Sequence, residues 1–408
     1  MDDKYRAFDF VLTCAGIHIF SRRKWDSKAK FAHQICNSIV AVLTCIFTTG
    51  FLVVETDVIL WIEGVCIWIT GAIMYMLVGL SLVYRKEFRE FLEEMIFRDG
   101  LMDMPIIEHA MKSTSEGKLN ELKGLVIKTE EKLVKYPSLL LKSYACSTSS
   151  TAVMYVCDAI YQMIVREDES LRLFGFNMWF PWKLENFNVY IATFIFHAYA
   201  GFICILVFPG VQTTIILLMG QMVRQLHVLT FIVLHLDDLV MEMVHVRGER
   251  WQEECTAILS QCVDQYVKVK RFGNRLNSIC RSFYLILILD AIVLVCVCSV
   301  KVAISHKLSH ELIKYVMHEF FFTLMVLQFC VMGQQIQNEC DKLEMAVLEK
   351  WYIFNKKHRT HVKIFHMAVI QRMPIYIFGT IPLSLPTFNW FLKTGMSFFT
   401  LVMSVLED

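Results

Sequence analysis

The sequence predicts an all-α protein that crosses a membrane with seven transmembrane helices. Hydrophobic residues make up 56% of the chain, Gly (17) and Pro (7) are sparse, and the formal net charge is +1. This composition is typical of a polytopic helical membrane protein, and the near-neutral charge does not favour a nucleic-acid partner. A run of roughly 20 apolar residues, rising about 1.5 Å per residue, is long enough to cross the bilayer core.

The N-terminal segment, residues 1–34, is predicted to lie in the cytoplasm. Basic residues crowd it before the first apolar run, and it lacks the short apolar core and cleavage site of a signal peptide. The first helix is predicted at about 35–54. A tight acidic turn then leads into a second helix at about 58–84.

The third helix is predicted at about 138–165, after Pro137, with a polar patch from Ser147 to Thr151. The aromatic-rich outer loop that follows, residues 166–188, has two interpretations: an interfacial belt, or a lid over a pocket. The fourth helix is predicted to start near Tyr190 and to continue past Pro209 as an amphipathic helix that projects into the cytoplasm.

The cytoplasmic connections are predicted to be amphipathic helices that form an intracellular helical anchor block. In 259–279 and 336–354, apolar residues recur at helical spacing, and such stripes must be buried. The chain is therefore divided into four regions. They are a cytoplasmic segment (1–34), six membrane helices with inner extensions at about 220–280 (35–335), anchor helices (336–380) and a last membrane helix (381–408).

Loop charge predicts the orientation of the helices. Basic residues crowd the N-terminus and the connections 85–135, 247–281 and 342–372, whereas the alternate loops carry few. Under the positive-inside rule the crowded loops are cytoplasmic. Seven spans then give a cytoplasmic N-terminus and an extracellular C-terminus, which is opposite to a G-protein-coupled receptor.

The last apolar run, 385–406, has Lys393 as its only formal charge and carries hydroxyl side chains on one helical face. The segment PLSLPTFNWFLKTGMSFFTLVMSVL, from Pro382, resembles the C-terminal signature of the insect odorant receptors. LQFCVMGQQIQNECDKLEMAVLEKWYIF, from Leu327, is similar to the Cys-x-x-Gly, acidic and Trp pattern of their sixth helix. Phe398 stands where that family usually has Tyr, and the chain extends the signature by Glu407 and Asp408.

The resemblance implies an odorant-gated, non-selective cation channel subunit in the plasma membrane of sensory neuron dendrites. It further implies a heterotetramer with odorant co-receptor subunits around a central pore lined by the seventh helix, and small volatile odorants, membrane lipids and permeating cations as partners. Two alternatives are a gustatory-type homomeric channel and a seven-helix metabotropic chemoreceptor. Orientation distinguishes the second of these from the channel.

Motifs for catalysis and cofactor binding are absent, so neither an enzyme nor a cofactor is expected. His358, His361 and His366 lie close in sequence, but the basic residues around them favour a solvated face over a metal site. Charged residues in or near apolar runs need water or a partner. They are Glu63, Asp158, Asp290, Glu319 and Lys393, of which Glu63 and Asp158 are expected to reach water at the outer side.

A pocket for a small apolar odorant should combine hydrophobic and aromatic side chains with a few polar groups. Helices two, three, four and six offer such residues at similar depth, although each one alone is compatible with ordinary helix packing. The predicted set comprises Met74, Tyr75, Ser147, Ser150, Thr151, Met154, Phe196, Tyr199, Ala200, His318, Phe321 and Phe322.

A gate is predicted near the outer end of the last helix. Leu401, Ser404 and Val405 share one face, and Thr400 and Ser397 continue it inward. The resemblance implies that the matching positions narrow the pore, and a hydrophobic ring can hold a pore shut by dewetting. The alternative is that these residues pack against neighbouring helices.

Overall fold

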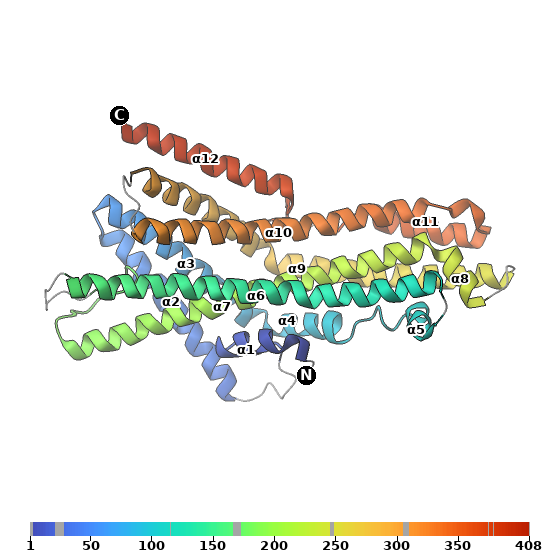
Figure 1. The fold of residues 1–408 in the computed structure, drawn as a ribbon, viewed down its shortest axis with the longest axis horizontal. Coiled ribbons are helices and arrows are strands. Elements are labelled where there is room, and N and C mark those ends of the chain that lie inside the picture. Colours follow the sequence, from blue (N-terminus) through green and yellow to red (C-terminus); the bar gives the residue numbers. More distant parts are fainter. Residues whose placement is uncertain are drawn as a thin grey trace.

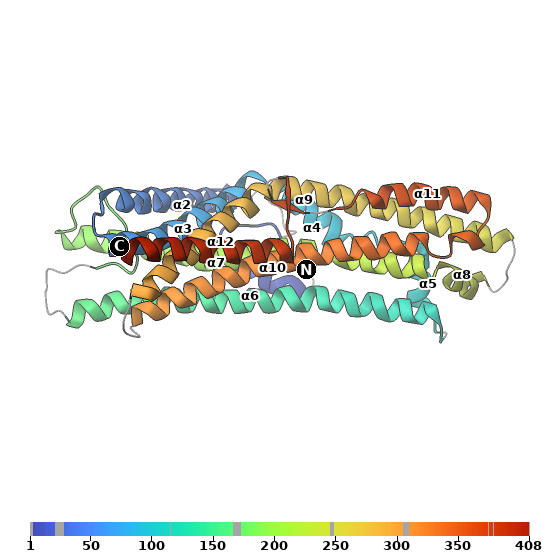
Figure 2. The same ribbon diagram turned by 90° about the horizontal axis from the view of Figure 1, so that it is seen from above.

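The computed structural model describes residues 3–20, 28–114, 116–165, 173–244, 249–304, 310–373, 375–377 and 379–407. They form an elongated bundle whose longest helices run along one common axis (Figure 1, Figure 2). The all-α prediction is confirmed. The strands in the described residues are the two-residue β1 (Tyr376–Ile377) and β2 (Ile381–Pro382), which pair antiparallel through a turn at Gly379, whose φ is +86°.

The helices follow in chain order. They are η1 (Asp3–Tyr5), α1 (Arg6–Cys14), α2 (Lys28–Val54), α3 (Val58–Val83), α4 (Arg85–Leu92), the π-helical η2 (Glu93–Phe97), α5 (Pro105–Lys112), α6 (Lys118–Val165), α7 (Phe187–Leu234), α8 (Leu236–Val244), α9 (Glu249–Ile304), α10 (His310–Leu348), η3 (Trp351–Ile353), α11 (Lys356–Ile370) and α12 (Leu385–Glu407).

Within the described residues, α2, α3, α7, α9 and α10 contain segments long and apolar enough to cross a membrane. With 48 and 23 residues, α6 and α12 are also long enough to cross. At about 1.5 Å per residue, the 48 residues of α7 and the 56 of α9 far exceed a bilayer core of about 30 Å. These helices therefore extend well beyond the membrane.

The predicted start of the third helix after Pro137 is wrong, because α6 continues through this proline from Lys118 to Val165. Proline removes one hydrogen bond from the helical ladder, which weakens but need not end a helix. The helix packs against α7 on both sides of Pro137, at Leu133 beside Gly220 and at Thr148 beside Ile205. The same holds for α7 itself, which continues through the buried Pro209.

The N-terminal segment is part of the bundle, which the sequence analysis did not anticipate. Phe8 and Leu12 of α1 are fully buried, and α1 packs against α7. Gly210 makes this contact possible, because a Cβ there would lie 2.8 Å from Leu12 Cδ2. The following α2 begins at Lys28, several residues before the predicted start, and its Asn37 Nδ2 donates to the Ala15 carbonyl at 2.7 Å.

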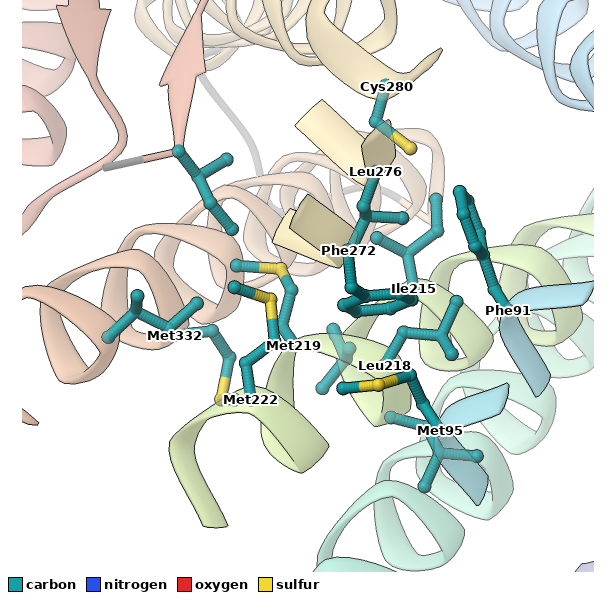
Figure 3. Close-up of a cluster of buried hydrophobic side chains, with 14 of the residues drawn as sticks. Phe91, Met95, Ile215, Leu218, Met219, Met222, Phe272, Leu276, Cys280 and Met332 are labelled. Carbon is teal, nitrogen blue, oxygen red and sulfur yellow. The ribbon is translucent and has the colours of Figure 1, made fainter. Parts of the chain in front are cut away.

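Much of the core lies in the half of the bundle formed by α4, η2, the C-terminal halves of α7 and α10 and the N-terminal half of α9. Phe91 and Phe272 meet edge to face at 5.0 Å between ring centroids. The flexible side chains of Met219, Met222 and Met332 fill the space beside them (Figure 3). The helix α7 is central to this packing, and each of its residues from 207 to 219 is buried.

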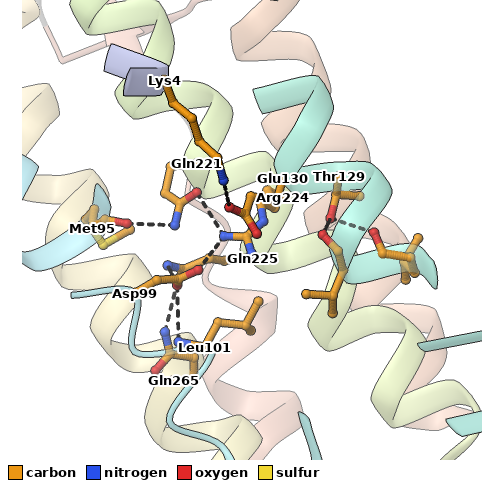
Figure 4. A network of polar contacts seen from close by, with 12 residues as sticks. Lys4, Met95, Asp99, Leu101, Thr129, Glu130, Gln221, Arg224, Gln225 and Gln265 are labelled. Carbon is orange, nitrogen blue, oxygen red and sulfur yellow. Dashed lines mark hydrogen bonds and ion pairs between the residues drawn. The ribbon is translucent and has the colours of Figure 1, made fainter. Parts of the chain in front are cut away.

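A buried polar network connects α7 and α9 to the chain between η2 and α5 (Figure 4). Arg224 pairs with Asp99, Gln225 Nε2 donates to Asp99 Oδ1 at 3.2 Å, and Gln265 Nε2 donates to Gln225 Oε1 at 2.9 Å. Gln221 Nε2 donates to the Met95 carbonyl at 2.7 Å. Buried polar contacts therefore connect the C-terminal half of α7 to α9 and to the chain after η2.

The predicted apolar stripe of 259–279 is buried, and Tyr266 contacts Phe365 of α11. The solvated face predicted for the histidines is wrong for His358, which is 1% exposed and stacks on Phe354 at 3.9 Å. Helical periodicity turns it inward, away from the half-buried His361. The described residues contain no group of His, Cys, Asp or Glu side chains placed to hold a metal.

Candidate ligand-binding cavity and pore helix

A cavity of about 130 Å³ lies where α3, α6, α7 and α10 meet, in the half of the bundle away from α11. Its wall is mainly apolar and aromatic, with several hydroxyl groups, one amide and one imidazole. The lining residues are Thr44, Ile67, Thr70, Gly71, Met74, Tyr144, Ser147, Thr148, Thr151, Ala152, Tyr155, Phe176, Met178, Ala200, Gly201, Cys204, Ile205, Phe208, Pro209, Gln212, His318, Phe321, Phe322 and Met325.

The structure brings much of the predicted pocket set together. Residues from all four of the helices chosen from the sequence line the cavity: Met74, Ser147, Thr151, Ala200, His318, Phe321 and Phe322. The spacing of Ser147 and Thr151, one helical turn apart, places both on the same face of α6. Contact of these residues with a ligand stays a prediction.

The other members of the set lie outside the lining. Tyr75 is 48% exposed, because it follows the inward-facing Met74 and is turned by about 100° around the helix. Ser150 is exposed and Met154 is half-buried. Phe196, one turn before Ala200, packs against Phe47 at 5.6 Å. Tyr199 turns toward α2, where its hydroxyl donates to Asn37 Oδ1 at 2.6 Å.

Polar residues that the sequence analysis did not select also line the cavity. Tyr144 precedes Ser147 by three residues on the inward face of α6, and Gln212 follows Phe208 by one turn of α7. Thr70 of α3 contacts His318 of α10, with 3.1 Å between Oγ1 and Nε2. Helical periodicity applied from Ser147 identifies Tyr144, and a lone amide in an apolar run marks Gln212.

The loop before α7 closes one end of the cavity. Phe176 and Met178 reach the lining, and the Phe176 backbone N–H donates to His197 Nε2 at 3.0 Å. The Phe176 ring also stacks on His197 at 4.8 Å. Trp182 Nε1 donates to Thr193 Oγ1 at 2.9 Å while its ring remains 42% exposed. The loop thus combines a covering segment with an exposed aromatic rim.

The helix α12 packs by one face only. Phe391 is buried, and a Cβ on Gly395 would lie 2.9 Å from Val295 Cγ1, so α12 and α9 approach closely here. The predicted gate residues Ser397, Thr400, Leu401 and Ser404 lie on the exposed face. The side chain of Val405 lies outside the described residues, as do those of Glu407 and Asp408.

Hydroxyls on this exposed face bond to their own helix. Ser397 Oγ donates to the Lys393 carbonyl at 2.9 Å, and Ser404 Oγ donates to the Leu401 carbonyl at 2.8 Å. The face therefore needs no partner chain to satisfy these groups. Its Lys393 is exposed. Of the carboxylates expected at the outer side, Glu63 is half-buried, and the side chain of Asp158 lies outside the described residues.

The sequence profile of the family described as 7tm Odorant receptor matches residues 118–396, about two thirds of the chain. This chain belongs to the odorant receptor family. The odorant receptor described here is therefore a seven-helix membrane protein of a receptor family and not of an enzyme family, as the sequence predicted. The orientation of its termini stays a prediction. The chain matches no curated protein.

Solved structures share the fold of this odorant receptor over nearly its full length. The olfactory receptor OR5 of the insect Machilis hrabei, in complex with eugenol, is 13% identical with a TM-score of 0.80. A second structure of the same OR5 is 12% identical, also with a TM-score of 0.80. Each comparison covers 98% of this chain and 97% of the other. At these identities the likeness shows the fold.

Proposed function

We propose that this odorant receptor is the odorant-binding subunit of a cation channel in the plasma membrane. A small volatile organic molecule occupies the cavity between α3, α6, α7 and α10, and its binding opens a pore. The observation that carries the proposal is the cavity itself, which is covered by the Phe176 loop and combines an apolar wall with a few polar groups. That chemistry suits a small, largely apolar ligand.

The exposed face of α12 is the proposed pore lining, and its Leu401 is 58% exposed in the single chain. Apolar side chains at the far end of the bundle support assembly into a tetramer with odorant co-receptor subunits. Tyr352 is 64% exposed and Met367 is 62% exposed on η3 and α11. Large apolar side chains gathered on one surface are typical of a protein interface. Loop charge places this end in the cytoplasm.

The test is a whole-cell recording from cells that express the receptor with the co-receptor, challenged with an odorant panel. Ala152→Trp fills the cavity and should abolish the odorant-evoked current without changing surface expression. Ala192→Trp, on an exposed part of α7, serves as the matched control and should leave the response intact. An unchanged response in Ala152→Trp would contradict the proposed site.

The same recording distinguishes the alternatives. Current from cells that express only this receptor indicates a homomeric, gustatory-type channel. Current that disappears when G-protein signalling is blocked indicates a metabotropic receptor. The proposed heteromeric channel requires the co-receptor and is insensitive to that block.

A further inference from the structure

Four residues of the cavity lining have a buried side-chain N or O atom without a hydrogen-bond partner within the described part of the chain. These atoms are Tyr144 OH, Ser147 Oγ, Gln212 Nε2 and His318 Nδ1. Tyr144, Ser147 and Gln212 are at least nine-tenths buried. The neighbouring Thr148 and Thr151 differ, because their hydroxyls donate to carbonyls of α6. A buried polar group without a partner is unfavourable, so a ligand that supplies partners gains affinity.

The hydrogen-bonding role of His318 follows from its neighbour. Thr70 Oγ1 donates its only proton to the Cys66 carbonyl at 3.0 Å. In the 3.1 Å contact with Thr70 Oγ1, His318 Nε2 must therefore be the donor. A charged imidazolium with an unpaired N–H is strongly disfavoured in an apolar cavity, so the ring is neutral. His318 Nδ1 is then an acceptor and requires a donor from the ligand.

The remaining groups are donors. Gln212 Nε2 can only donate, and the hydroxyls of Tyr144 and Ser147 each have a proton available. We infer that the cavity selects a neutral, ring-sized molecule with a hydroxyl group, an alcohol or a phenol. Its O–H donates to His318 Nδ1, and its oxygen accepts from one of the three donors. This inference rests on the proposed function, namely that the cavity is the odorant site.

The size of the cavity limits the molecule that carries the hydroxyl. Its volume of about 130 Å³ is comparable to that of an apolar cavity of about 150 Å³ that binds benzene. One ring with its hydroxyl therefore fills the space, and a long chain or a second ring does not fit. The apolar wall, which includes Phe208 and Phe322, covers the body of the ring.

The test uses the purified full-length receptor in lipid nanodiscs and measures dissociation constants by ligand-detected NMR. The probes are cyclohexanol, cyclohexanone and methylcyclohexane, which have equal numbers of heavy atoms. Only the alcohol has a donor. Cyclohexanol should bind about 3- to 10-fold more tightly than cyclohexanone, the range expected for one hydrogen bond. His318→Phe should remove this preference, and His318→Gln, which keeps an acceptor, should retain most of it.

The outcomes separate this inference from the proposed function. Ala152→Trp should abolish binding of all three probes; if it does so while the unmodified receptor binds alcohol and ketone equally, only the hydroxyl inference fails. If Ala152→Trp leaves binding unchanged, the proposed site and the inference both fail. A preference for cyclohexanol that persists in a correctly folded His318→Phe variant overturns the role of His318. Failure of the unmodified receptor to bind cyclohexanol overturns the inference as well.

Discussion

Burial controls the protonation of His358, which lies on α11. The ring stacks on Phe354, and Thr256 Oγ1 lies 3.2 Å from its Nδ1. Burial first, and then the nearby His361, lower the pKa of His358 from 6.5 to about 4. In the folded protein the imidazole therefore stays neutral at pH values where the unfolded chain already binds a proton.

That shift predicts a pH dependence of stability. Between pH 6.5 and about 4 the unfolded state binds more protons at this site, so the free energy of unfolding falls as the pH falls through this window. Thermal unfolding of the full-length receptor in nanodiscs, measured at pH 7 and pH 5, should show this loss. His358→Phe should reduce it, while His109→Phe, at an exposed position of α5, should not. An equal loss in all three proteins would contradict the assignment.

In the buried polar network of α7 and α9, the ion pair of Arg224 and Asp99 should be the contact whose loss lowers stability most. Their side chains are 4% and 14% exposed. Arg224→Met leaves Asp99 buried without its charge partner, which should cost about 3–5 kcal/mol of unfolding free energy. Glu130→Gln breaks the exposed ion pair with Lys4 and should cost no more than about 1 kcal/mol. Denaturant unfolding measures both, and equal effects would contradict the ranking.

At the scale of elements, Gly333 explains the Cys-x-x-Gly part of the sequence motif in physical terms. A Cβ at this position of α10 would lie 2.1 Å from the Leu383 carbonyl oxygen and 3.0 Å from its carbon. The backbone that leads from β2 into α12 therefore rests directly on α10. Only glycine permits so close an approach without moving one of the two elements.

Gly333→Ala should displace the start of α12 and cost about 1–3 kcal/mol, the range for overpacking. The matched control is Gly124→Ala on α6, where an added Cβ meets nothing within 4 Å. It should be neutral or stabilising by about 0.5–1 kcal/mol, because alanine is the better helix former. Unfolding midpoints test both variants, and loss of stability in Gly124→Ala alone would contradict the packing described here.

Elements that follow from local pattern are predictable, whereas those set by tertiary contact are not. Apolar runs locate the membrane helices, and period 3.6 identifies the buried stripe that includes Tyr266 and Phe272. The continuation of α6 through Pro137 depends on packing along α7, which no local signal reveals. The burial of α1 likewise depends on its close approach to α7 at Gly210, where a Cβ would contact Leu12. For the cavity residues, the sequence predicted how deep in the membrane each one lies. It did not predict which face of the helix each one occupies, so Met74 lines the cavity while its neighbour Tyr75 is exposed.

At the scale of the whole molecule, topology is the first consequence of the proposal. The positive-inside rule, applied to seven membrane helices, predicts that the C-terminus lies outside the cell. An epitope tag after Asp408 should therefore stain unpermeabilised cells, and a tag before Met1 should stain only after permeabilisation. Staining of the N-terminal tag alone on intact cells would reverse the topology and with it the channel interpretation.

The central claim is that one chain carries a ligand cavity and a separate pore helix. The most direct test is a whole-cell recording from the double variant Ala152→Trp/Leu401→Ala, co-expressed with the co-receptor. Shortening the exposed Leu401 should weaken the proposed hydrophobic constriction and raise the ligand-free current, whereas the filled cavity should eliminate the odorant response. The account predicts a persistent leak that odorant does not change. A double variant whose ligand-free current equals that of the unmodified receptor, or that still responds to odorant, would contradict it.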